Sequence, residues 1–207
     1  MTPTAVLDAQ AAGAFVVDTR PLACYTAGHL PGALPIEFNL ADLAERAALL
    51  LPPGVRVVVH AEPEASVEAS VGLLEDAGCT VLGHLEGGLS AWRAAGLDVA
   101  TMETIDADQL AAAGGAYGIL DVREPFEYRH GHLEGAQLLP SGEAFERITA
   151  GAIEPPEGRP FAVFCSGWGR AAFVAGLLQA RDIPAVLVAG GMYSWQQRGH
   201  PVVVRTG

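Results

Sequence analysis

FVVDTRPLACYTAGHLPGALP, at residues 15–35, recurs in altered form as GILDVREPFEYRHGHLEGAQL at residues 118–138. Eight of the 21 aligned positions are identical, at a constant offset of 103 residues. Residues 87–99 and 190–202 match at the same offset and share a Gly-Gly pair and a tryptophan. Two matching blocks, in the same order and at one offset, predict two homologous domains.

The length and composition agree with a two-domain protein. The chain has 207 residues, of which 50% are apolar and 17% are charged, and this balance excludes a disordered chain. We place the domains at residues 1–100 and 101–207, because about 100 residues is a common domain size.

Charge and cysteine content exclude several classes of protein. With 12 basic and 24 acidic residues the net charge is −12, which argues against binding to nucleic acid or an anionic membrane. Cys24, Cys79 and Cys165 form no Cys-x-x-Cys pair, so neither a disulfide framework nor a zinc ribbon is expected. The sequence shows no signal peptide and no run of about 18 apolar residues. We therefore expect a cytoplasmic protein.

Short β-branched runs alternate with helical patterns in both halves. The expected strands are residues 15–18, 56–60 and 80–85 in the first half and residues 118–121, 161–164 and 185–188 in the second. Residues 66–78 and 171–182 are expected helices, the latter with its large apolar residues on one face. Strands separated by helices predict an α/β fold, with a mostly parallel sheet in each domain and helices on both of its faces.

The segment Cys165-Ser166-Gly167-Trp168-Gly169-Arg170 joins an expected strand to an expected helix. Open α/β sheets place their ligand sites in such turns, beyond the carboxyl ends of the strands. We expect Gly167 and Gly169 to adopt positive φ, so that backbone N–H groups form an anion-binding nest at the helix N-terminus. With Arg170 adding a positive charge, the Cys165 thiol should have a lowered pKa. A buried structural cysteine before an ordinary glycine-rich turn is the alternative.

With these motifs, both halves resemble rhodanese domains, and the whole chain resembles a tandem rhodanese-type sulfurtransferase. The residues that carry the resemblance are Asp121 and Arg123 at a strand end, Gly-His-Leu-x-Gly-Ala at 131–136 and Gly-Gly-x-x-x-Trp at 190–195. The active loop of this family starts at a cysteine and commonly ends with arginine in the sixth position. Cys165 and Arg170 occupy those two positions.

The resemblance implies transfer of a sulfane sulfur by double displacement. Cys165 would attack a small anionic donor such as thiosulfate, and backbone N–H groups of residues 166–170 would hold the resulting persulfide. A thiol, cyanide or a sulfur-carrier protein would then accept the sulfur. The resemblance implies no organic cofactor and no metal.

The second half departs from the family pattern in one loop residue. Trp168 stands where the family often has glycine, which leaves the loop path and the choice of substrate open. Arg129 and Arg147 are further cations of this half, and either a substrate role or an ordinary surface role fits them.

The first half lacks a comparable loop. Aligned at the strand ends, His60 takes the position of the cysteine and Ala65 that of the arginine. The loop carries Glu62 and Glu64 instead, whose charges would repel an anionic donor. We therefore expect the first domain to be catalytically inactive.

The aspartate and arginine of the motif recur in this inactive half as Asp18 and Arg20. That recurrence favours a structural pair, and binding of an anionic substrate by Arg123 is the alternative. Asp121 is then the structural partner of Arg123 beside the site.

Other repeated residues are interpreted in the same way. His132 recurs as His29, so we expect a structural histidine near the site rather than a general base. Trp195 recurs as Trp92 and is expected in the core. His130 and His132 lie two residues apart with no further ligand pattern, so no metal site is expected.

Two other functions remain open. Rhodanese domains also occur as non-catalytic binding or regulatory modules. Rhodanese-fold phosphatases and arsenate reductases have a loop that is one residue longer, usually with histidine before the cysteine. Here four residues separate Cys165 from Arg170 and Phe164 precedes the cysteine, and a shorter ring fits a sulfur atom better than a tetrahedral oxyanion.

Overall fold

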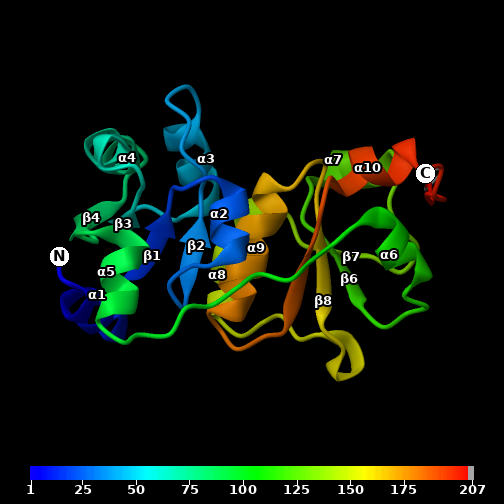
Figure 1. The fold of residues 1–207 in the computed structure, drawn as a ribbon. Coiled ribbons are helices and arrows are strands. Elements are labelled where there is room, and N and C mark those ends of the chain that lie inside the picture. The colour runs from blue at the N-terminus through cyan, green and yellow to red at the C-terminus, as the bar shows by residue number, and fades with distance from the viewer. Residues whose placement is uncertain (205–207) are drawn as a thin grey trace. The chain divides into compact units, whose positions relative to one another are not determined.

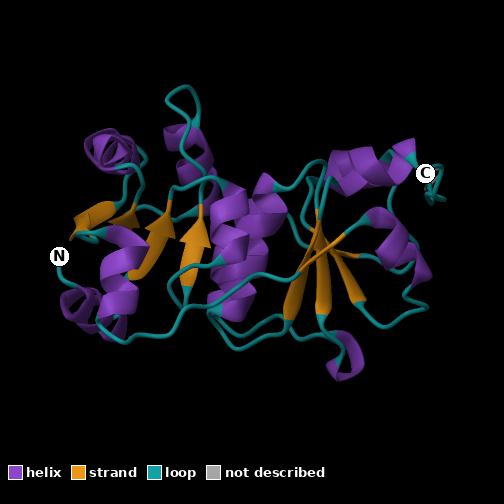
Figure 2. Cartoon of the chain, viewed as in Figure 1, coloured by secondary structure: helices purple, strands orange, loops and turns teal. Residues whose placement is uncertain are grey.

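The computed structural model describes residues 1–204, and the chain divides into two compact units between Met102 and Glu103. Each unit contains one sheet with helices around it (Figure 1, Figure 2). All strand pairs within the two sheets are parallel.

The first unit has four strands in the order β2-β1-β3-β4. Its elements are α1 Pro3–Ala11, β1 Phe15–Asp18, α2 Leu22–Ala27, β2 Ala33–Pro35, α3 Leu43–Leu50, β3 Arg56–His60, the 3₁₀ turn η1 Glu64–Ser66, α4 Val67–Asp76, β4 Thr80–His84 and α5 Gly88–Ala94. Helices α3 and α4 pack together on one face of the sheet, and α1 and α5 lie on the other (Figure 1).

The second unit has five strands in the order β5-β9-β8-β6-β7. Its elements are β5 Thr104–Ile105, α6 Ala107–Ala112, β6 Gly118–Asp121, α7 Pro125–Arg129, β7 Gln137–Leu138, α8 Ser141–Thr149, η2 Pro156–Gly158, β8 Phe161–Phe164, α9 Gly169–Gln179, β9 Ala185–Val188 and α10 Gly191–Gln197. Helices α8 and α9 cover one face of the sheet, and α6 and α10 cover the other (Figure 1). Helices α7 and α10 lie near the same end of β8 (Figure 1).

The predicted α/β fold with parallel sheets is confirmed, and the six expected strands match β1, β3, β4, β6, β8 and β9. Strands β8 and β9 are buried at every residue because helices cover both faces of the sheet. Their sequences therefore read as continuous apolar runs rather than as alternating patterns.

One apolar cluster of the second unit lies between the sheet and helices α6 and α10 and includes Trp195. The indole N–H of Trp195 donates to the Pro201 carbonyl over 2.9 Å, and that of Trp92 donates to the Asp98 carbonyl over 2.8 Å. Helix α9 is buried from Ala171 to Leu178 without interruption, so its burial extends beyond the face that carries its large apolar residues. Its alanines and its glycine have small side chains, which let the helix pack closely against β8, β9 and α8.

No helix formed by residues 1–204 is long and apolar enough to cross a membrane.

Candidate active site

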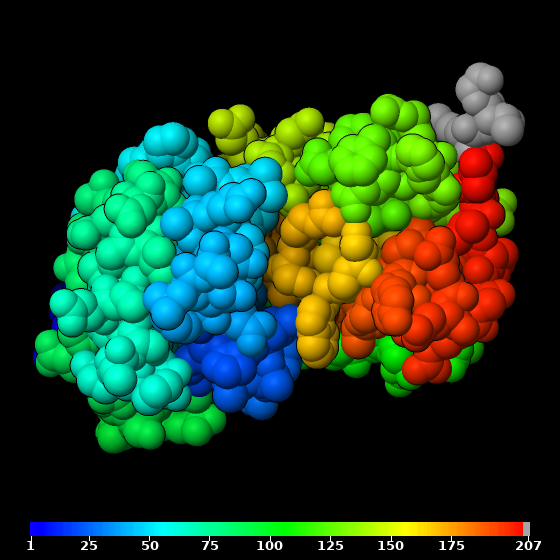
Figure 3. Space-filling view, turned by 90° about the horizontal axis from the view of Figure 1, so that it is seen from above, coloured from blue at the N-terminus to red at the C-terminus, as the bar shows by residue number. Residues whose placement is uncertain are grey.

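The segment from Cys165 to Arg170 connects β8 to α9, and the Cys165 side chain is only 2% exposed. The backbone N–H groups of Gly167, Arg170 and Ala171 favour the thiolate form of this side chain. These groups belong to the loop and to the first turn of α9, one residue beyond the expected range of 166–170. Seen from above, the yellow-to-orange atoms of this region lie between the lime-green atoms around α7 and the orange-red atoms of α10 (Figure 3).

The pKa of the Cys165 thiol is raised, and burial is the main cause. Removal of water from the sulfur disfavours the thiolate more than its neighbours favour it. The opposing influences are the Ala171 N–H, the charge of Arg170, and the N–H groups of Gly167 and Arg170. The expectation of a lowered thiol pKa was therefore wrong.

This shift predicts that alkylation of Cys165 by iodoacetamide accelerates with rising pH. The rate should increase about tenfold per pH unit from about pH 7 to about pH 8.5, because the thiolate remains the minor form in that range. The measurement is peptide-resolved mass spectrometry of the full chain, with exposed Cys24 in the same sample confirming that the reagent is active. A rate that already levels off near neutral pH would contradict the raised pKa.

The loop is held in place by the N-terminus of α10. The N–H of Met192 donates to the Cys165 carbonyl over 2.8 Å, and that of Tyr193 donates to the Ser166 carbonyl over 3.1 Å. A Cβ atom on Gly191 would overlap the carbonyl oxygen of Cys165 and come within 2.5 Å of that of Gly167. Only glycine therefore lets the helix start this close to the loop.

The left-handed glycines of the site are Gly190, with φ of 72°, and Gly191, with φ of 50°. Neither Gly167 nor Gly169 has such a φ, so the expectation of positive φ at those two positions was wrong. The N–H groups that favour the thiolate lie where a helix begins immediately after the loop, and the loop itself is not left-handed.

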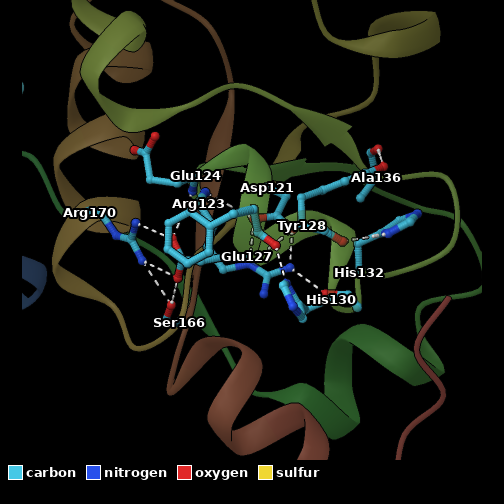
Figure 4. A network of polar contacts seen from close by, with 12 residues as sticks. Asp121, Arg123, Glu124, Glu127, Tyr128, His130, His132, Ala136, Ser166 and Arg170 are labelled. Carbon is cyan, nitrogen blue, oxygen red and sulfur yellow. Dashed lines mark hydrogen bonds and ion pairs between the residues drawn. The ribbon is translucent and has the colours of Figure 1, made fainter. Parts of the chain in front are cut away.

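Glu127 of α7 is a site residue that the sequence motifs did not indicate. Its carboxylate accepts from Arg170 Nη1 over 2.7 Å, from Arg170 Nη2 over 2.9 Å and from the Ser166 hydroxyl over 2.6 Å (Figure 4). Arg170 Nη2 also donates to the Ser166 oxygen over 2.9 Å. Bonding to Arg170 is the main reason that the pKa of Glu127 is lowered to about 2. The charge of Arg170 is thus paired, where the sequence suggested a free cation.

The two halves of the chain contain a signal that could have identified this pair. The 103-residue offset places Cys24 at the position of Glu127, and the strand register described below places Ser66 at that of Arg170. Both partners of the ion pair are therefore absent from the half that lacks the cysteine loop. When two residues form an ion pair in one repeat, a diverged repeat that no longer needs the pair can lose both of them, so their joint absence indicates that they interact.

The pair predicts that Glu127→Gln makes Cys165 more reactive. Glutamine can still bond to Ser166 but no longer compensates the charge of Arg170, so the thiolate is stabilised. Alkylation of Cys165 at neutral pH should rise about three- to tenfold, and its pH profile should move to lower pH. Glu134→Gln, which removes an exposed carboxylate of the same unit, is the matched control and should leave the profile unchanged. An unchanged or slower reaction of the Glu127 variant would contradict this electrostatic role.

Asp121 and Arg123 form a buried pair at the end of β6. Arg123 Nε and Nη2 donate to the Asp121 carboxylate over 2.9 and 2.6 Å, and Nη2 donates to the Gly131 carbonyl over 2.8 Å (Figure 4). Asp18 and Arg20 make the same contacts in the first unit. The first unit has this arrangement although it lacks a loop like that of Cys165. The geometry of the Asp–Arg pair therefore fits a support for the loop that follows it.

His132 also has a counterpart with the same contacts. Its Nδ1 lies 3.0 Å from the Tyr128 carbonyl oxygen, and its ring stacks on Tyr128 with 3.8 Å between centroids. His29 and Tyr25 repeat this arrangement with distances of 2.8 and 3.8 Å. The ring of His132 is therefore used for packing, and its Nδ1 lies within hydrogen-bonding distance of a backbone carbonyl.

A cavity of about 390 Å³ lies beside the cysteine loop. It is lined by Arg123, Phe126, Glu127, His130, Gly131, Met192 and Gln196. Trp168 does not line it, and its side chain is 46% exposed. Arg129 is also exposed, and Arg147 pairs with Glu143 at 3.8 Å on α8.

The corresponding loop of the first unit is shifted by one residue from its expected alignment. His60 pairs with Asp18 in the sheet as Phe164 pairs with Asp121, so Ala61 and Ser66, not His60 and Ala65, stand at the positions of Cys165 and Arg170. His60 is the last residue of β3, and its imidazole is buried. The equivalent position still holds no thiol.

The Glu62 side chain of this loop bonds to the backbone at the start of α5. Its Oε1 accepts from the Leu89 N–H over 3.0 Å, as the Cys165 carbonyl accepts from Met192 in the second unit. A carboxylate thus takes the place of a loop carbonyl at the start of α5. Glu64, by contrast, is exposed and lies 3.4 Å from His84.

No group of three or more histidine, cysteine or acidic side chains within residues 1–204 is arranged to hold a metal ion.

The family model described as "Rhodanese-like domain" matches residues 2–95 and 106–198. The chain belongs to the rhodanese family. The two matched segments lie in the two structural units, so this is a rhodanese-family protein with tandem domains.

Curated relatives match one part of the chain. "Probable adenylyltransferase/sulfurtransferase MoeZ" of Mycobacterium tuberculosis is 30% identical over 98 residues, which cover 44% of this chain and 23% of that protein. "Uncharacterized protein slr1261" of Synechocystis is 27% identical over 86 residues, or 41% of this chain and 46% of that protein. The chain thus spans less than half the length of either relative.

Solved structures include both single-domain and longer relatives. A rhodanese-related protein of Thermoplasma volcanium is 30% identical with a TM-score of 0.44, covering 50% of this chain and 99% of that one. A thiosulfate sulfurtransferase of Pseudomonas aeruginosa is 21% identical with a TM-score of 0.42, covering 99% of this chain and 43% of that one.

Proposed function

We propose that this protein is a sulfurtransferase whose second domain carries sulfur as a persulfide on Cys165, while the first domain is catalytically inactive. The observation that carries the proposal is the placement of buried Cys165 between β8 and the start of α9, where the backbone N–H groups of Gly167, Arg170 and Ala171 favour a negative charge on its sulfur. Such donors stabilise negative charge on sulfur without adding a side chain that could itself react. A relative named as a probable adenylyltransferase/sulfurtransferase supports the same assignment.

The first half-reaction forms one sulfur–sulfur bond and breaks another. The Cys165 thiol loses its proton to solvent, and the thiolate attacks the outer sulfur of an anionic donor such as thiosulfate. The electron pair of the broken bond leaves with sulfite. The outer sulfur remains on Cys165 as a persulfide, whose negative charge the N–H groups of the loop and of α9 hold.

The second half-reaction returns the enzyme to its starting state. A thiol, cyanide or a sulfur-carrier protein attacks the outer sulfur of the persulfide. The electron pair of the persulfide bond returns to the sulfur of Cys165, which is again a thiolate. We place the entry of donor or acceptor at the cavity lined by Phe126, His130 and Met192, because its lining residues Glu127 and Met192 bond to the loop.

The test is intact mass spectrometry after incubation with thiosulfate or mercaptopyruvate. We expect a gain of one sulfur atom that disappears when cyanide is added. Cys165→Ser should abolish the gain, whereas Cys24→Ser, which removes an exposed cysteine from the first domain, should leave it intact. Comparing the rates with the two donors would identify the preferred one.

Other results would favour the other interpretations. If no donor forms an adduct, a non-catalytic rhodanese-like binding module becomes the better assignment. A persulfide on the Cys165→Ser variant would contradict the inactivity of the first domain. Release of phosphate from a generic phosphate ester would favour a rhodanese-fold phosphatase.

A further inference from the structure

The first unit has a cavity of its own, with a volume of about 500 Å³. It lies beyond the carboxyl ends of β1 and β3 and is lined by Thr19, Pro21, Glu37, Phe38, Leu40, Glu62, Pro63, Ala65, Ser66 and Ala69. A volume of this size suits a small organic molecule. Nothing in the proposed sulfur transfer uses this cavity.

The walls of the cavity combine apolar surface with negative charge. Phe38, Leu40 and Pro63 supply apolar surface, and Leu40 is 70% exposed although its side chain is large. Glu37 and Glu62 are the charged lining residues, and no arginine or histidine is among the lining residues that the structure describes. A ligand that covers the apolar surface would therefore meet two carboxylates and no cation from the lining.

The Glu62 carboxylate has three polar neighbours within the first unit. Besides accepting from the Leu89 N–H, its carboxylate lies 3.5 Å from Nε2 of buried His60 and 3.8 Å from Nη1 of Arg20. Its side chain is nevertheless 44% exposed, so part of it faces the cavity.

Glu37 is less constrained at its side chain. Arg46 Nη2 donates to the Glu37 backbone carbonyl over 2.5 Å, which anchors the main chain. Within residues 1–204 its carboxylate forms no ion pair, and the side chain is exposed. It is thus a negative charge at the cavity that is available to a ligand.

We propose that this cavity binds a small organic cation with an aromatic or branched apolar body. The cationic group would lie near Glu37 and Glu62, and the apolar body would cover Phe38, Leu40 and Pro63. The preference is opposite to that proposed for the second unit, which would take an anionic sulfur donor. The first unit is then a ligand-binding domain, whatever reaction Cys165 performs.

The test uses phenethylammonium as the probe and isothermal titration calorimetry of the full chain. 2-Phenylethanol and 3-phenylpropionate are the neutral and anionic analogues with a similar apolar body. We expect the cation to bind at least about tenfold more tightly than either analogue, and its affinity to fall as salt is added. Equal binding of the three compounds, or no binding of the cation at millimolar concentration, would overturn the proposal.

Two variants and a control locate the site. Glu37→Gln should weaken binding of the cation about three- to tenfold, because it removes one charge while keeping the shape of the side chain. Ala69→Leu should weaken it by filling the cavity without changing charge. Glu45→Gln removes an exposed carboxylate of α3 that does not line the cavity, and should have no effect. An equal loss in the Glu37 and Glu45 variants would show general attraction to an acidic protein and would overturn the proposed site.

Discussion

Replacing Gly191 with alanine should destabilise the second unit by about 3 kcal/mol or more and reduce sulfur loading of Cys165 at least about hundredfold. The new Cβ would overlap the Cys165 carbonyl oxygen and approach that of Gly167 to 2.5 Å. Both obstacles are backbone atoms, so neither can rotate away as the end of a side chain could. The start of α10 or the loop must shift, and either shift breaks the bonds that Met192 and Tyr193 donate.

Variants at two other glycines distinguish the effect of this clash from the effect of backbone strain alone. Gly199 has φ of 76°, but a Cβ added there would meet no atom within 4 Å, so Gly199→Ala should cost only about 1 kcal/mol and leave sulfur loading intact. Gly88 is the counterpart in the first unit, and its Cβ would meet the Glu62 side chain, which can move. Denaturant unfolding and intact mass measure the two effects. If the Gly191 and Gly199 variants behave alike, close approach to the loop is not the reason for glycine at 191.

Asp121→Asn should destabilise the second unit by about 3–5 kcal/mol, because it leaves the Arg123 guanidinium buried without its counter-charge. Asp121 is fully buried, and its carboxylate takes three side-chain hydrogen bonds from Arg123. The amide keeps the shape but offers one oxygen and no charge. Removing both partners, as in Asp121→Asn with Arg123→Met, should cost less than the single change, since no buried charge is then left unpaired.

Hydrogen exchange resolved by peptide can check where this loss occurs. Protection should fall in β6 and α7, the elements that the pair joins. The corresponding Asp18→Asn change should act on β1 and α2 instead, because Asp18 and Arg20 make the same contacts in the first unit. If Arg123→Met alone raised the donor concentration needed for half-maximal sulfur loading while protection did not change, Arg123 would bind substrate rather than support the loop.

Part of the fold could be predicted because its signals are local or repeated. The six longer strands lie in continuous apolar runs, and the internal repeat on its own indicates two similar domains. Strands β2, β5 and β7 have only three, two and two residues and were not predicted, since so short a segment carries no periodicity. The one-residue shift at His60 has a similar origin, because an apolar run does not mark which residue ends its strand.

The site was predictable in its position and less so in its electrostatics. A cysteine between a strand and a helix is visible in the sequence, and it is buried at that place in the structure. The ion pair of Glu127 and Arg170 joins residues 43 positions apart, and no local pattern indicates such a partner. The direction of the Cys165 pKa shift depends on how much water reaches the sulfur, which is a property of the packed loop.

The sequence by itself determined the tandem α/β architecture and the strand–loop–helix segment that carries Cys165. Periodicity, repetition and residue type are sufficient for those conclusions, because they depend on neighbours along the chain. Only the tertiary structure decided that Arg170 is paired, that Cys165 has a raised pKa, and that Gly191 lets α10 hold the loop. Burial, charge compensation and close backbone approach depend on residues distant in sequence, and folding alone brings those residues together.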